Sequence, residues 1–294
     1  MELDLIDEDI NVLKINKGEI TIYLTNGSVN YFSLKNITEL YISHNPIRDL
    51  PVLPDFLLVL KCDRCELKSL PSLPKSLKGL NCISNEITIL PELPDTLERL
   101  DCGQNHVQIL PRLPTKLERL NCSYNTIQSL PLLPDSLKEL NCSANKLQNL
   151  PLLPKSLLYL WCGTNNLSEL PNLPETLDRL GCYDNRLRFL PRLPNITMLR
   201  CNLNQLQTLS WLPDTLNELN CMHNPLVFIF PQPNKPQYCW VPDNFKQLYS
   251  NYTYPIYYKR YQTYFYLISY LTLEFNLLPS ALSNDFWWFP IAIG

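Results

Sequence analysis

The sequence predicts a repeat solenoid, in which short coils of one β-strand and one extended, proline-rich return stack on one another. Three observations predict it. Cysteines recur every twenty residues from Cys62 to Cys182 and then stand at Cys201 and Cys221. The 294 residues include 26 prolines against 7 glycines, so the chain is interrupted too often for a helix bundle or a doubly wound sheet. One phrase, L-x-x-L-x-C-x-x-N-x-L-x-x-L-P-x-L-P, surrounds these cysteines with few departures.

Each part of the phrase predicts one part of a coil. Alternating apolar and polar residues predict a short strand whose second leucine and cysteine point inward. The asparagine that follows predicts an inward turn, because its amide can donate to and accept from the backbone of neighbouring coils. Proline fixes φ and removes a donor, so the Leu-Pro-x-Leu-Pro part predicts a polyproline-like return. Ten copies fill residues 37–230, and they open at Ile37, Leu57, Leu77, Leu97, Leu117, Leu137, Leu157, Leu177, Ile196 and Leu216.

The phrase resembles that of the leucine-rich repeat family, in its short twenty-residue form with Leu-Pro-x-Leu-Pro on the convex side. This form is known from bacterial effector proteins delivered into host cells, and similar arrays occur in giant DNA viruses. Over residues 37–230 the resemblance implies a leucine-rich repeat solenoid, mainly β, with a parallel sheet lining its concave face. It also implies a surface that binds another protein, and it implies no reaction. Some bacterial relatives carry a C-terminal ubiquitin-ligase domain, but residues 231–294 are too few for one.

Several copies depart from the phrase. The first has Ile42 at the cysteine position, and the second has Cys65 at the asparagine position. One residue is missing between Cys182 and Cys201, and Ser210 replaces a proline, so we expect the last two coils to bend or twist differently. In the tenth copy Phe230 displaces the first proline, and the phrase ends there.

Residues 1–36 predict an N-terminal hairpin cap. Alternating β-forming residues at 19–24 and 29–34 flank the dipeptide Asn26-Gly27, which is the strongest short-range signal for a β-hairpin. Such a hairpin would cover the open apolar end of the first coil, as the terminal caps of solenoids must.

Residues 231–294 predict an aromatic C-terminal cap that seals the last coil. Of the 31 aromatic residues, 20 follow Pro225. Residues 231–236 are typical of an extended linker, and one helical face would then carry Tyr264, Ile268, Leu271 and Phe275. The alternative is an exposed aromatic docking surface, ending at residues 286–289, that contacts a partner or a membrane interface.

Charge and the N-terminal residues limit the class of partner and the compartment. A formal net charge of -3 gives no general attraction to nucleic acid, and the arginines expected on the concave face are interrupted by Glu139 and Glu218. We therefore expect a protein or peptide ligand, no nucleic acid, no membrane and a monomeric chain. The acidic N-terminus does not resemble a signal peptide, which predicts a cytoplasmic protein, in the host cytoplasm if it is viral or an effector.

No catalytic, metal or cofactor site is predicted. Cys62 and Cys65 have zinc-type spacing, but no second Cys pair or His pair follows, so we interpret the cysteines as small apolar core residues. The sequence contains no HExxH, no Ser-His-Asp arrangement and no phosphate-binding glycine loop.

The candidate binding residues are the aromatic and arginine side chains expected on the concave face, where most other positions are small, polar or charged. Trp161 would stand between Asn141 and Gly181, and the glycine would leave its ring face open. Aromatic and arginine side chains dominate interface energetics. In the alternative, these rings only pack on one another, with Arg179 over Tyr159. The candidates are Tyr159, Trp161, Arg179, Tyr183, Arg119, Tyr124 and Arg200, with Met198 beside them.

The sequence therefore predicts a non-enzymatic scaffold that recognises a partner protein on its concave face. The alternative is an adaptor or effector that presents bound targets to a host degradation or signalling machine through its C-terminal segment.

Overall fold

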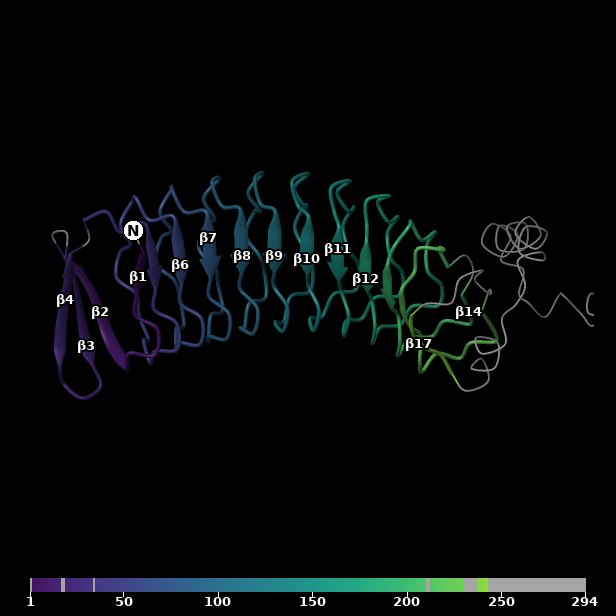
Figure 1. The fold of residues 1–294 in the computed structure, drawn as a ribbon, viewed down its shortest axis with the longest axis horizontal. Coiled ribbons are helices and arrows are strands. Elements are labelled where there is room, and N and C mark those ends of the chain that lie inside the picture. Colours follow the sequence, from purple (N-terminus) through teal and green to yellow (C-terminus); the bar gives the residue numbers. More distant parts are fainter. Residues whose placement is uncertain (1, 17–18, 34, 210–211, 230–236, 243–294) are drawn as a thin grey trace, which may run out of the picture.

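The computed structural model describes residues 2–16, 19–33, 35–209, 212–229 and 237–242. Most of them form a row of stacked coils, with a separate three-stranded sheet beside its N-terminal end (Figure 1). Each coil contributes one short strand, and the strands join in a 12-stranded parallel sheet. The predicted solenoid with its parallel sheet is confirmed. In chain order the strands of this sheet are β1 Glu2–Asp4, β5 Glu39–Tyr41, β6 Val59–Lys61, β7 Gly79–Asn81, β8 Arg99–Asp101, β9 Arg119–Asn121, β10 Glu139–Asn141, β11 Tyr159–Trp161, β12 Arg179–Gly181, β13 Met198–Arg200, β15 Glu218–Asn220 and β17 Tyr238–Trp240.

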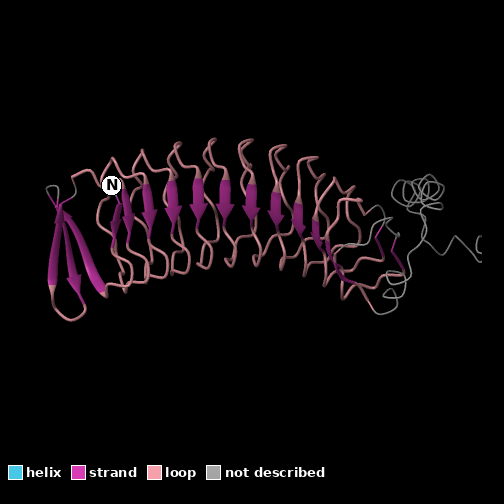
Figure 2. Cartoon of the chain, viewed as in Figure 1, coloured by secondary structure: helices cyan, strands magenta, loops and turns pink. Residues whose placement is uncertain are grey.

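The core lies behind this sheet. The middle residue of each repeat strand is a buried leucine, such as Leu120 at 2% exposure. The residue two positions later, Ile42 in the first coil and a cysteine in the others, is also buried. The described chain consists of strands and loops (Figure 2), and within it no helix has the length and apolar character to span a bilayer.

Buried asparagines link each coil to its neighbours. Asn85 donates from Nδ2 to the carbonyls of Cys62 at 2.9 Å and Cys82 at 3.0 Å, while its Oδ1 accepts from the Leu67 amide at 3.1 Å. The same set of bonds recurs at Asn105, Asn125, Asn145, Asn165, Asn185, Asn204 and Asn224. The predicted role of these asparagines is confirmed, because they pair backbone groups that the turn would otherwise leave unsatisfied in the core.

The asparagine ladder, as we call this series, is interrupted at Cys65. The thiol donates weakly to the Ile42 carbonyl at 3.4 Å and cannot replace the amide oxygen. The Ile47 amide, which would meet that oxygen in a regular coil, instead donates to the carbonyl of Asn45 at 2.7 Å.

The proline-rich returns contain no strand until the ninth and tenth coils. There β14 (Thr208–Leu209) pairs in parallel with β16 (Phe228–Ile229). At this place the phrase has lost a proline in both coils, to Ser210 and to Phe230. Proline cannot donate to a β-ladder, which agrees with a backbone pair at the place where the phrase has lost its proline. The different bend or twist expected of the last two coils stays a prediction.

At the N-terminus three antiparallel strands, β2 (Ile10–Asn16), β3 (Glu19–Leu24) and β4 (Val29–Ser33), form a second sheet. The turn between β3 and β4 contains Gly27 at φ 88°, so the predicted hairpin is present, while β2 and the sheet strand β1 were not predicted. Asn45, only 1% exposed, ties this region to the first coil by bonds to the Leu5 carbonyl and the Ile10 amide. The capping role itself stays a prediction.

The parallel sheet continues one strand past residue 230, where the phrase ends. In β17 Cys239 is in register with Leu219, so it stands at the position of the inward leucine and packs against the core. The predicted helical face at 264–275, the aromatic run at 286–289 and most of the predicted C-terminal cap lie outside the described residues.

Candidate functional site

The first and third residues of each sheet strand point away from the core and form what we call the sheet face. On most strands these side chains are small, polar or charged. Aromatic side chains stand at these positions in three places. Lys61 on β6 places its Nζ 4.0 Å from the centroid of the Tyr41 ring on β5, and on β17 the rings of Tyr238 and Trp240 stack with their centroids 6.3 Å apart. The third place is β11, β12 and β13, where aromatic and arginine side chains meet. We call the set Tyr159, Trp161, Arg179, Tyr183 and Arg200 the ring cluster.

Two arginines of the ring cluster lie over two of its rings. The parallel register sets Tyr159 opposite Arg179, and the Arg179 Cζ lies 5.3 Å from the centroid of the Tyr159 ring. From the next strand, Arg200 places its Cζ 5.9 Å from the centroid of the Trp161 ring. Both are cation–π distances, and the Arg179 contact is the one that the packing alternative predicted.

Two glycines make room for the other contacts. A Cβ atom on Gly181 would overlap the six-membered ring of Trp161, and one on Gly163 would lie 2.5 Å from Cε1 of Tyr183. Trp161 from β11 therefore leans over the backbone of β12, and Tyr183 leans back over the preceding coil. The expectation that Gly181 leaves a face of Trp161 open was wrong, because the ring covers the glycine.

Acidic neighbours hold the two arginines. The Arg200 Nε donates to Glu218 Oε1 at 2.5 Å, and the Arg179 Nε lies 3.5 Å from Asp178 Oδ2. The side chain of Glu218 is 15% exposed and that of Arg200 is 45% exposed, so the carboxylate lies beneath and the guanidinium faces solvent. The ring cluster is thus half-buried, held in one arrangement, and open to solvent through its arginines.

The remaining predicted site residues lie elsewhere on the solenoid. Arg119 is on β9, two strands from β11, and its Nε is 3.4 Å from Glu139 Oε1. Tyr124 lies in the turn after that strand and is 60% exposed, with φ of 53°. The structure brings Met198 beside Arg179 in register, but it does not bring Arg119 or Tyr124 into the ring cluster.

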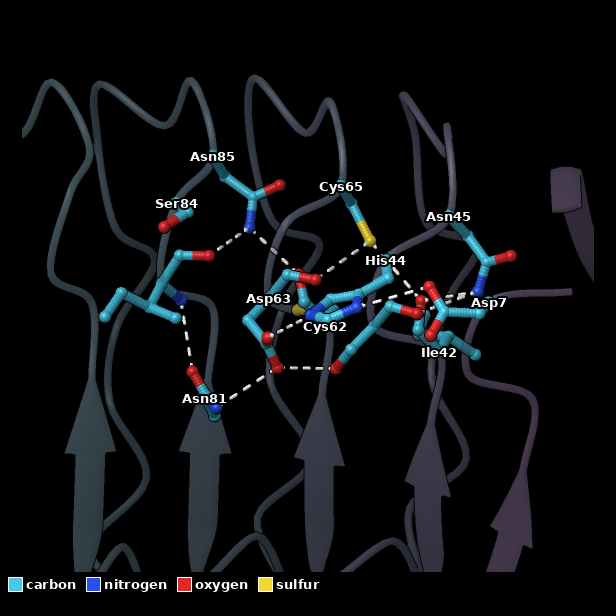
Figure 3. Close-up of polar contacts among 12 residues, drawn as sticks. Asp7, Ile42, His44, Asn45, Cys62, Asp63, Cys65, Asn81, Ser84 and Asn85 are labelled. Carbon is cyan, nitrogen blue, oxygen red and sulfur yellow. Dashed lines mark hydrogen bonds and ion pairs between the residues drawn. The ribbon is translucent and has the colours of Figure 1, made fainter. Parts of the chain in front are cut away.

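A polar network that was not predicted lies at the N-terminal end (Figure 3). His44 places Nδ1 3.2 Å from Asp7 Oδ1 and Nε2 3.6 Å from Asp63 Oδ2. Asp63 also accepts from Ser43 Oγ and from Asn81 Nδ2 at 3.2 Å. Ser43 and His44 both contact Asp63. Within the described residues no hydrogen bond joins the Ser43 hydroxyl to the His44 imidazole, which is the bond that would activate a nucleophile. The network links the N-terminal segment to the first coils.

The ten buried cysteines are in environments that suppress thiol chemistry. Burial raises the pKa of Cys102, Cys142 and Cys182 to about 12 and that of Cys65 to about 11. Because the thiolate is the reactive form, these thiols are poor nucleophiles and metal ligands. No group of three His, Cys, Asp or Glu side chains within the described ranges could hold a metal ion.

Solved structures show which fold this is. The leucine-rich repeat domain of APL1B superposes with a TM-score of 0.55 at 25% sequence identity, covering 66% of this chain and 64% of that domain. This chain has the leucine-rich repeat fold. The leucine-rich repeat domain of a Shigella effector is 38% identical over 47% of this chain and 63% of that chain, with a TM-score of 0.45.

A third leucine-rich repeat structure, YopM from Yersinia enterocolitica, is 31% identical over 67% of this chain, with a TM-score of 0.42. The present leucine-rich repeat chain covers 58% of YopM, so it spans less than two thirds of the length of each of these proteins. No family model matches the chain, and no curated protein matches it in sequence.

Proposed function

We propose that this leucine-rich repeat protein is a non-enzymatic recognition scaffold that binds a partner protein on its sheet face, with the ring cluster as the anchor. The sheet face is the side that the family resemblance identifies as concave. Leucine-rich repeat proteins are typically recognition scaffolds without catalytic activity, and the similar APL1B structure is a leucine-rich repeat domain. The observation that carries the proposal is the ring cluster itself.

Physical arguments support this choice of anchor. Aromatic and arginine side chains bury large areas and dominate binding energy at interfaces. In the ring cluster, the contacts with Gly163, Gly181 and Glu218 fix the side chains before binding, so little conformational entropy remains to be lost. Arg119 and Tyr124 would then be peripheral contacts two strands away.

Comparative affinity capture with matched variants tests the proposal. The double variant Trp161→Ala/Tyr183→Ala removes two rings of the anchor. Leu132→Ala/Leu152→Ala removes two side chains that are 87% and 86% exposed on the proline-rich side, and it serves as the control. We expect the first variant to lose the partners that wild type and control retain, with unfolding midpoints measured in parallel. Equal partner recovery by a folded ring variant would support the alternative in which the rings only pack on one another.

We further propose the class of ligand, the oligomeric state and the compartment. The ligand is a protein or peptide and not a nucleic acid, and the chain acts as a monomer in the cytoplasm without a metal or cofactor. The adaptor alternative depends on the C-terminal segment, of which residues 243–294 lie outside the described part, and no observation favours it over simple recognition.

A further inference from the structure

The charges of the sheet face are distributed unevenly along the solenoid. At its N-terminal end β1 carries Glu2 and Asp4, and Glu2 lies in register with Glu39 of β5. From β8 to β13 the sheet face carries four arginines, Arg99, Arg119, Arg179 and Arg200, against two acidic residues, Asp101 and Glu139. One end of the face therefore repels an anionic ligand, and the part that contains the ring cluster attracts it.

Arg99 and Arg119 lie directly opposite each other on neighbouring strands. Adjacent like charges destabilise a sheet, and only one of these two is neutralised by an ion pair within the described residues, namely Arg119 by Glu139 at 3.4 Å. Asp101, on the same strand as Arg99, instead accepts from the Gly103 amide at 3.3 Å and from Asn121 Nδ2 at 3.0 Å. Arg99 is therefore available for an external acid.

The arginines of the ring cluster are also available. Glu218 engages only the Nε edge of Arg200, and no other described residue hydrogen-bonds to its terminal amino groups. A guanidinium has five N–H donors and binds a carboxylate in a bidentate manner. Arg200 can therefore donate to a ligand carboxylate while it keeps its hydrogen bond to Glu218. Arg179, 48% exposed, lies over the Tyr159 ring and presents its donors in the same way.

We infer that the segment recognised by the sheet face is an acidic, extended peptide that crosses β8 to β13, with carboxylates over both arginine pairs and an apolar side chain on the Tyr159–Trp161 rings. This inference rests on the proposed function and names its ligand class. The gap from β9 to β12 is three strand spacings, or about 14 Å, which an extended chain spans with about four residues. The matching peptide therefore has two acidic pairs about four residues apart, with apolar residues between them.

A continuous polyphosphate fits this face less well than a peptide. Glu139 lies between the two arginine pairs, at the same strand position as Arg119 and Tyr159. A nucleic acid backbone would place phosphates over that carboxylate, whereas a peptide can place an apolar residue there.

Fluorescence anisotropy with a labelled peptide, Asp-Asp-Leu-Tyr-Leu-Asp-Asp, whose inner aspartates are about four residues apart, tests the inference on the full chain. We expect binding that weakens with added salt, and no binding of the peptide in which lysine replaces every aspartate. Arg179→Gln/Arg200→Gln and Arg99→Gln/Arg119→Gln should each weaken binding about tenfold. The control Arg112→Gln/Arg192→Gln removes the same charge from the proline-rich side, where these arginines pair with Asp95 and Glu175, and it should bind as wild type does.

Three results would overturn the inference: no binding of the acidic peptide, equal binding of the lysine peptide, or equal losses in the control variant. A single-stranded oligonucleotide of the same charge serves as a second probe. If it bound as tightly as the peptide, the ligand class would be a nucleic acid and not a peptide. If Trp161→Ala/Tyr183→Ala loses its captured partner while both sheet-face arginine variants keep it, the recognition function stands and the acidic ligand is wrong.

Discussion

Trp161 and Tyr183 owe their positions to two residues that lack side chains. Each ring occupies the space above the glycine of the neighbouring coil, Gly181 for Trp161 and Gly163 for Tyr183. The Trp161 ring therefore covers the backbone of β12 at Gly181, and the Tyr183 ring covers the turn that follows β11 at Gly163. A side chain at either glycine would force a ring outward and change the shape of the candidate site.

Gly181→Ala should destabilise the chain by about 1–3 kcal/mol, because the new methyl group overlaps the Trp161 ring. Gly79→Ala is the matched control on β7, where the nearest side-chain atom to a new Cβ would be 3.7 Å away in ordinary contact. Urea unfolding of both variants measures the difference. In a Trp161→Ala background the cost of Gly181→Ala should largely disappear, and a cost that persists would show that the overlap with Trp161 is not its cause.

Coils are joined chiefly by the asparagine ladder and by the parallel strands. The ladder was predictable, because an asparagine repeated at a turn can satisfy both donors and acceptors. Strands β1, β2 and β17 were not, because they lie outside the repeated phrase. Ser210 and Phe230 indicated that the last two coils differ from the others. That the difference is the β14–β16 strand pair could not be predicted, because it depends on which backbone groups come into register. The residues of the candidate site were predicted from the sequence. The direction in which each ring leans could not be predicted, because it depends on packing between coils.

Cys65→Asn should repair the interruption of the ladder. The new amide would accept from the Ile47 amide and donate to the Ile42 carbonyl, as Asn85 does one coil later, and each added bond contributes about 1 kcal/mol. We expect a higher urea midpoint. The reciprocal variant Asn105→Cys, which removes the 2.9 Å bonds to the Cys82 carbonyl and the Ile87 amide, should lower it. A Cys65→Asn chain no more stable than wild type would show that the thiol already satisfies this turn.

The whole molecule is a one-dimensional array in which ten buried thiols, from Cys62 to Cys221, run through one core. Such an array has no central nucleus, so its stability is a sum over coils and coil interfaces. A property shared by every coil therefore acts on the whole stack at once, and the protonation of these thiols is such a property.

Stability should fall steeply at alkaline pH. Burial raises the pKa of these thiols above the ordinary value of 9.0, to about 12 at Cys102 and Cys142, so the folded chain keeps protons that the unfolded chain releases. Stability is then full below about pH 9 and falls as pH rises toward the folded pKa, by about 1.4 kcal/mol per pH unit for each thiol. Replacing one thiol, as in Cys142→Ala, should reduce the slope of unfolding free energy against pH by one thiol's share. An unchanged slope would contradict this account.

Because the coils have a regular length, the strands of the sheet face follow one another at a constant spacing. The ladder bonds and the strand register are the same from one coil to the next over the regular repeats, so adding or removing twenty residues would leave every surviving junction chemically unchanged. Loss of the coil that carries β10 would set Arg119 beside Tyr159 and remove Glu139 from between the arginine pairs. Duplication of that coil would separate the pairs by one further strand spacing of about 4.8 Å. Gain or loss of one repeat in the gene would thereby change the length of the peptide segment that the sheet face binds, without any amino-acid substitution.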